Sequence, residues 1–133
     1  MRLRNHILIL LLGFLIILSC TNTERYKRDL LSDNREKIMK ACYELGEKKD
    51  TSSVKNLLHK ALDPRISHDL RFKGMSVNYC RLGALQKISG NAYKGELNQF
   101  NSDTIATTFF LSWAVNNGYL TSKTEVDIYY YNK

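Results

Sequence analysis

The sequence has few of the residues that metal sites and catalytic centres use. Its 133 residues include three histidines, three cysteines and one proline. It contains no Gly-rich phosphate-binding loop, no Cys-x-x-Cys pair and no nucleophile elbow. Ser67, His68 and Asp69 are neighbours in the chain, and adjacent side chains point apart instead of converging as a catalytic triad does. A metal site needs three or four convergent ligands, so we expect no metal, no cofactor and no enzyme activity.

A hydrophobic run long enough to span a membrane is also missing. The longest run, Ile7 to Leu18, has 12 residues and only Gly13 interrupts it, whereas a spanning helix needs roughly 20. Arg2 and Arg4 precede the run. A basic start followed by roughly 7–15 apolar residues is typical of a secretory signal peptide. Residues 1–19 are therefore predicted to be a leader that is cleaved during export.

The end of the leader indicates the kind of export. Ile17 stands three positions before Cys20 and is too large for ordinary signal peptidase, which favours small residues there. The stretch Ile17-Leu18-Ser19-Cys20 instead resembles the lipobox of bacterial lipoproteins. The resemblance implies that Cys20 receives a diacylglyceryl group, carries acyl chains such as palmitate and becomes the anchored N-terminus. The alternative is an ordinary secreted protein in which Cys20 is buried or forms a disulfide.

The lipobox resemblance also implies a location. In lipoproteins an Asp after the cysteine commonly signals retention in the inner membrane, and Thr21 occupies that position here. The chain is therefore expected on the periplasmic side of a membrane, with the cell outer membrane favoured over the inner one. Its net charge of +7 is compatible with anionic partners, although the basic residues are spread along the chain and predict a solvated surface. Export makes nucleic acid an unexpected partner.

The rest of the chain is predicted to form one helical domain over residues 33–133, joined to the lipid by a polar tether over 20–32. Apolar residues recur at helical spacing in four segments. Capping and terminating residues give the limits of these segments. The segments run from Asp33, which forms a capping box with Glu36, to Gly46, from Asp50 to Asp63, from Ser76 to Gly90, and from Asp103 to Gly118. The inner faces predicted for the last two helices are Val77, Cys80, Ala84, Leu85 and Ile88, then Ile105, Phe109, Phe110, Trp113 and Ala114. Alternation of apolar and polar residues predicts a short strand at Glu125–Tyr131.

Part of the helical region repeats weakly with a period of about 40 residues. At that offset Lys40–Leu45 aligns with Cys80–Leu85. Three features of the first unit resemble the pattern of a HEAT repeat. They are Leu45-Gly46, Val54 with Leu57-Leu58, and Asp63-Pro64-Arg65. The resemblance covers residues 33–90 and implies an all-α fold, a short HEAT-like stack of α-hairpins with about four helices. The alternative is another kind of small α-helical bundle.

The loop that follows Pro64 is the candidate partner-binding site. It gathers basic residues around one aromatic side chain: Arg65, His68, Arg71 and Lys73 around Phe72. Long loops on repeat proteins often form a contact face. The alternative is a solvated connector whose Phe72 packs into the core.

Cys42 and Cys80 remain once Cys20 is assigned to the lipid. Both are predicted on inner faces of neighbouring helices. In an oxidising periplasm they either form a disulfide or stay as buried free thiols, which behave as small hydrophobic side chains.

The function predicted from these features is binding without catalysis. The leading hypothesis is a membrane-anchored periplasmic lipoprotein that acts as a protein-binding or envelope-scaffold module, with another envelope protein as its partner. One alternative is an immunity-type inhibitor that blocks a toxin with the loop after Pro64. The other is an enzyme or ligand carrier with a pocket beside Trp113.

Overall fold

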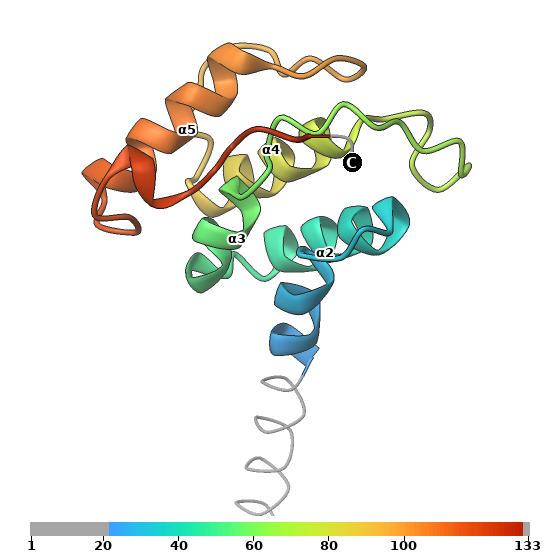
Figure 1. The fold of residues 1–133 in the computed structure, drawn as a ribbon, viewed down its shortest axis with the longest axis horizontal. Coiled ribbons are helices and arrows are strands. Elements are labelled where there is room, and N and C mark those ends of the chain that lie inside the picture. Colours follow the sequence, from blue (N-terminus) through green and yellow to red (C-terminus); the bar gives the residue numbers. More distant parts are fainter. Residues whose placement is uncertain (1–21, 132–133) are drawn as a thin grey trace, which may run out of the picture.

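The computed structural model describes residues 22–131, which form an all-α fold (Figure 1). Its α-helices are α2 (Arg35–Glu47), α3 (Val54–Leu58), α4 (Val77–Ile88) and α5 (Thr104–Asn116). Two 3-10 helices, η1 (Thr51–Ser53) and η2 (Lys123–Glu125), complete these elements, and residues 22–29 are helical as well. The predicted all-α fold class is thereby confirmed.

Two sequence predictions lie outside the described residues. They are the leader at 1–19 and the lipobox ending at Cys20, and both stay predictions. Within residues 22–131, no helix combines the length and the apolar character that crossing a membrane requires.

Local capping signals place three helix starts. Ser76 and Asp103 cap α4 and α5 as predicted, because each side chain accepts a hydrogen bond from a first-turn amide. The predicted cap of the first long helix was one residue early. Asn34, and not Asp33, accepts the bond from the Lys37 amide at 2.9 Å.

Helices α2 and α4 pack against each other at close range. A Cβ atom added at Gly46 of α2 would lie 3.0 Å from the Cα of Ala84 in α4, so a larger residue at this crossing would require α4 to shift by a few tenths of an ångström. The side chains of Ile38 and Leu45 on α2 and of Leu82 and Leu85 on α4 are buried as well. The pair forms the centre of the hydrophobic core.

The second predicted helix is shorter than expected. Its apolar stripe was predicted to run to Leu62 and the helix to end by Asp63, but α3 ends at Leu58. The amide of Lys60 donates to Asp127 O at 2.7 Å, and that of Leu62 donates to Ile128 O at 2.9 Å. Because the C-terminal segment supplies these acceptors, the chain leaves the helix to pair with it.

The C-terminal segment alternates as predicted but is not a strand. Val126 and Ile128 are buried, whereas Tyr129 and Tyr131 are exposed. Only the two hydrogen bonds given above join the segment to residues 60–62, so no strand is assigned within residues 22–131. Figure 1 shows this segment crossing the fold beside the chain that leaves α3.

The inner faces of two helices differ from the predicted ones. On α4, Cys80 and Ile88 are only partly buried, while the polar residues Asn78 and Arg81 are fully buried. On α5, Ile105 is 75% exposed, and Ala106, Phe110 and Ala114 face the core instead. Residues four apart share one face of a helix, so Ala106, Phe110 and Ala114 lie together, and the neighbouring Ile105 points away from that face.

Arg81 joins three parts of the fold. Its guanidinium donates to Asn56 O at 2.9 Å, to Leu57 O at 3.2 Å and to Leu30 O at 2.8 Å. Burial lowers the pKa of Arg81. Since Asn56 and Leu57 lie near the C-terminal end of α3, their carbonyls suit a cation.

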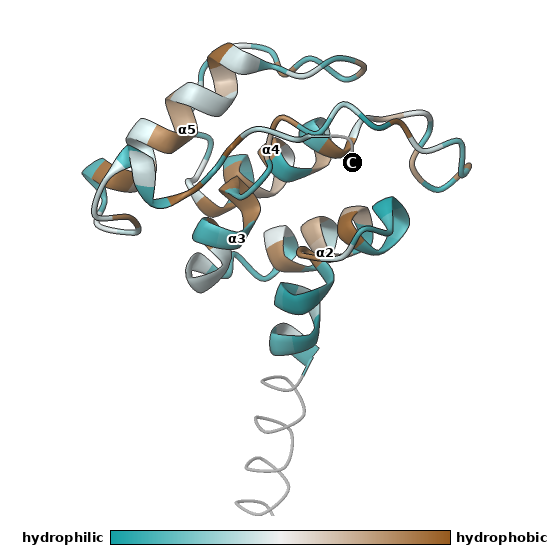
Figure 2. Ribbon diagram, viewed as in Figure 1, coloured by the Kyte–Doolittle hydropathy of each residue, from teal (hydrophilic) through white to brown (hydrophobic). Residues whose placement is uncertain are grey.

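The start of the described chain also differs from its prediction. The helix at 22–29 is hydrophilic (Figure 2), but Leu30 directly after it is 1% exposed and belongs to the core. The bond from Arg81 to Leu30 O holds this segment in place. The tether predicted over residues 20–32 was therefore wrong for residues 22–30, which are part of the folded domain.

Candidate binding groove

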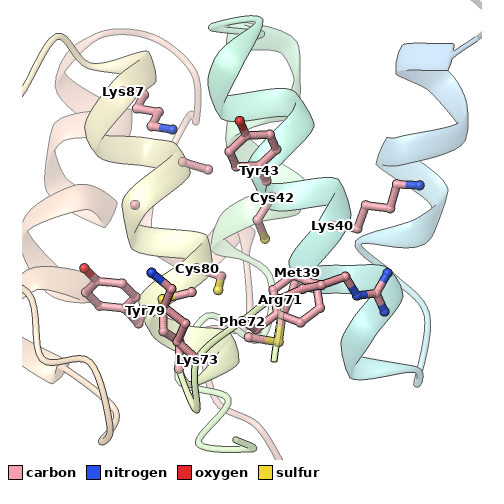
Figure 3. Close-up of a pocket in the computed structure, with 13 residues that line it drawn as sticks. Met39, Lys40, Cys42, Tyr43, Arg71, Phe72, Lys73, Tyr79, Cys80 and Lys87 are labelled. Carbon is pink, nitrogen blue, oxygen red and sulfur yellow. The ribbon is translucent and has the colours of Figure 1, made fainter. Parts of the chain in front are cut away.

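A groove lies between α2, α4 and the loop at residues 71–75 (Figure 3). Its volume is about 700 Å³. Apolar and sulfur-bearing side chains make up its interior: Met39, Cys42, Phe72, Met75, Cys80 and Ala84. Tyr43 and Tyr79 add two aromatic rings to the lining. The groove is thus an apolar hollow with few neutral polar groups.

The loop wall of the groove is held by short-range hydrogen bonds. The Phe72 amide donates to Asp69 O and the Met75 amide to Phe72 O, each at 2.9 Å. Lys73 and Gly74 both have positive φ, 49° and 72°, which turns the chain sharply after Phe72. Phe72 is half-buried and packs against the core. The loop therefore presents a defined surface to the groove.

The charges that line the groove are all positive. They are Lys40 of α2, Arg71 and Lys73 of the loop, and Lys87 of α4, and the lining contains no Asp or Glu. Among the described residues, neither Lys40 nor Lys73 takes part in an ion pair. Two cations are thus available to a ligand.

The other two cations have carboxylate partners outside the lining. Arg71 binds Asp69, and the arginine holds the pKa of that carboxyl at about 2. Lys87 binds Glu47 and lies 5.1 Å from the centroid of the Tyr43 ring. Arg71 and Lys87 therefore each have a carboxylate partner already.

The two cysteines face the groove together. Figure 3 shows Cys42 on α2 and Cys80 on α4 directed toward the same space, and both are free thiols. Burial raises the pKa of Cys42 to about 12 and that of Cys80 to about 11. Both thiols are therefore neutral at pH 7, and only a thiolate is a strong nucleophile.

The structure divides the predicted partner-binding loop in two. Arg71, Phe72 and Lys73 line the groove, whereas Arg65 and His68 do not. His68 is exposed to solvent.

Arg65 has a structural role in place of the predicted one. Its Nη2 lies 2.7 Å from Oδ2 of the buried Asp63, and its Nη1 donates to Asp33 O at 2.7 Å. The guanidinium also lies 4.6 Å from the centroid of the Tyr130 ring. Arg65 therefore joins the loop, the start of α2 and the C-terminal segment.

Trp113 lies away from the groove. Its ring contacts Phe110 and Tyr119, with centroid distances of 6.3 and 5.1 Å. It belongs to the aromatic packing of α5.

Eight of the 13 lining residues were not among the predicted site residues: Met39, Lys40, Tyr43, Met75, Tyr79, Gly83, Ala84 and Lys87. Gly83 lies in the middle of α4, and a Cβ atom added there would meet nothing within 4 Å. A glycine inside a helical pattern is a signal that sequence reasoning could have used, since it destabilises a helix by about 1 kcal/mol relative to alanine. The two lysines carry no such signal, because only the tertiary packing brings them to one rim.

Within residues 22–131, no three His, Cys, Asp or Glu side chains are grouped so that they could hold a metal ion.

In comparisons with known proteins, the chain matches no protein-family model, no curated protein and no solved structure. The resemblance to HEAT repeats stays a prediction.

Proposed function

We propose that this chain is a lipid-anchored protein of the bacterial envelope that acts by binding, with the groove between α2, α4 and residues 71–75 as its binding site. The lipobox resemblance at Cys20 supports the anchor. Covalent acyl chains stabilise membrane attachment by about 0.8 kcal/mol per buried CH₂ group. The proposed location is the periplasmic face, with the outer membrane favoured.

The observation that carries the proposal is the placement of Phe72. The loop containing this residue is the one that the sequence predicts as a contact surface. In the structure Phe72 forms part of an apolar wall, and the cations Arg71 and Lys73 flank it at the rim. An apolar hollow with a few placed polar groups is the usual form of a binding site.

Binding without catalysis is supported by the state of the groove's thiols. Cys42 and Cys80 are the two thiols of the lining, and a thiol acts as a strong nucleophile only when it is ionised. Their raised pKa values keep both protonated at neutral pH. We therefore assign them to the apolar interior.

The anchor is tested by labelling cells with radioactive palmitate. The wild-type chain is expected to take up label and to sediment with membranes. Cys20→Ala is expected to lose the label and to appear in the soluble fraction. If the variant keeps both the label and membrane attachment, the lipoprotein part of the proposal is wrong.

The groove is tested by affinity purification from membranes in mild detergent. Lys40→Glu/Lys73→Glu reverses the two unpaired cations, and Lys37→Glu/Lys123→Glu makes the same charge change on exposed residues outside the lining. We expect material that co-purifies with the wild-type protein to be lost from the first variant and kept by the second. Equal retention by both variants would contradict binding in the groove.

A further inference from the structure

We infer that the groove binds a single-chain anionic amphiphile, an acyl chain that carries a carboxylate, and this inference rests on the binding function proposed above. The groove offers an apolar interior for the chain and a cationic rim for the head group. Each part can be removed separately by substitution.

The interior suits a flexible hydrocarbon chain. Met39 of α2 and Met75 of the loop both line the groove, together with Cys42, Cys80 and Ala84. Methionine side chains are unbranched and polarizable, so they adapt to irregular apolar partners. The volume of about 700 Å³ lies within the range of roughly 300–1,000 Å³ that small-molecule sites have. The groove is thus of a size for a ligand of this kind.

Gly83 indicates that the space between α2 and α4 is kept open. Packing does not require glycine there, because a Cβ atom would meet nothing within 4 Å and φ is not positive. This differs from Gly46, where a Cβ atom would lie only 3.0 Å from the Cα of Ala84 in the neighbouring helix. A mid-helix glycine without a packing reason destabilises α4, and room for an occupant accounts for it.

The rim determines the charge of the ligand. Lys40 and Lys73 have no ion-pair partner in the described part of the chain, and Figure 3 shows them on opposite sides of the two cysteines. Asp69 and Glu47 already neutralise Arg71 and Lys87. A negatively charged head group at either side of the groove therefore has an unpaired ammonium group available and meets no carboxylate in the lining. A cationic or neutral amphiphile lacks this complementarity.

The test is equilibrium dialysis of radioactive dodecanoate against the acylated full chain in nanodiscs of zwitterionic lipid. Empty nanodiscs measure the dodecanoate that partitions into lipid. Gly83→Leu fills the groove from α4, and Thr108→Leu places the same side chain on the exposed face of α5 as its control. Lys40→Gln/Lys73→Gln removes the head-group contacts, and Lys37→Gln/Lys123→Gln is its control.

We expect one saturable site per wild-type chain, weakened at least 10-fold by Gly83→Leu and by Lys40→Gln/Lys73→Gln. Both controls are expected to bind as the wild type does. Dodecanol and acetate, which each lack one half of the ligand, are expected to compete poorly. Far-ultraviolet circular dichroism establishes that each variant is folded, and the lysine variants are surface changes that leave the core intact.

Two outcomes would overturn the inference. One is wild-type uptake equal to that of empty nanodiscs, and the other is equal weakening by the groove variants and their controls. If dodecanoate shows no saturable binding while a protein still co-purifies with the wild type and is lost from Lys40→Glu/Lys73→Glu, the groove binds a polypeptide. In that case the amphiphile inference is wrong and the proposed function stands. If neither binds through the groove, both fail.

Discussion

Replacing Arg81 with methionine tests whether one buried guanidinium holds three segments of the fold together. Arg81 is 2% exposed and donates to three backbone carbonyls, those of Leu30, Asn56 and Leu57. Methionine has a similar length and fills most of the space, so the change removes hydrogen bonds more than packing. In Arg81→Met all three carbonyls lose this donor.

The expected loss follows from these three bonds. A buried polar group that loses its partner costs about 1–3 kcal/mol, which gives roughly 3–9 kcal/mol for three. Burying a cation without a bonded carboxylate destabilises the folded state by several kcal/mol. Arg81→Met removes this penalty, which offsets part of the loss. We therefore expect the lower end, a decrease of about 3 kcal/mol in the free energy of unfolding.

The assay is urea denaturation followed by the fluorescence of Trp113, the single tryptophan. With a slope of about 1.5 kcal/mol per molar urea, the midpoint should fall by about 2 M. Arg28→Met is the control, because Arg28 is exposed. A midpoint for Arg81→Met within 0.5 M of the control, a margin of roughly 0.75 kcal/mol at that slope, would refute the reasoning.

Three further predictions concern single groups. Gly83→Ala should raise the free energy of unfolding by about 0.5–1 kcal/mol, because alanine favours the helix and its Cβ meets nothing; an unchanged or lower urea midpoint would contradict the open space at this position. Alkylation of Cys80 should accelerate about tenfold per pH unit between pH 8 and 10, since its pKa is raised to about 11; peptide-resolved mass spectrometry showing a plateau near the ordinary pKa of about 8.5 would contradict its burial. Lys55 and Thr121 hold the pKa of Glu125 at about 2, so their contacts should persist as the pH falls through about 4.3, the ordinary glutamate value, and break only near 2. The chemical shift of the Thr121 amide, which donates to Glu125, reports this titration, and a midpoint near the ordinary value would be the contrary result.

Local signals predicted much of the helical framework. Ser76 and Asp103 cap α4 and α5 because capping depends on a side chain and the amides two or three residues later. The end of the third predicted helix at Gly90 rests on a similar local signal, since Gly90 has a φ of 66° just after α4. Such features need no knowledge of the tertiary structure.

Features that depend on distant partners were not predictable in the same way. The early end of α3 depends on acceptors at Asp127 and Ile128, more than 60 residues away. The buried position of Arg81 was missed because arginine is rarely fully buried. Arg81 stands four residues after Val77 and four before Leu85, and this spacing places it on the apolar face of the helix. Its burial could therefore have been predicted from the sequence, but its hydrogen bonds to distant carbonyls could not.

The candidate site was predicted in part. The loop residues Arg71, Phe72 and Lys73 are contiguous, and their composition alone indicated a contact surface. Arg65 has the same side chain as Arg71, but its carboxylate partner at Asp63 is buried and its ring partner is Tyr130. Only the fold distinguishes the arginine that stabilises the structure from the one at the rim.

The most direct test of the binding groove is photo-crosslinking in living cells with a benzophenone amino acid at position 72. The matched control carries the same amino acid at position 108, on the exposed face of α5. If the groove binds a ligand, position 72 gives a discrete adduct of lipid or protein mass and position 108 gives none. Identical adducts from both positions, or no adduct from either, would contradict binding in the groove.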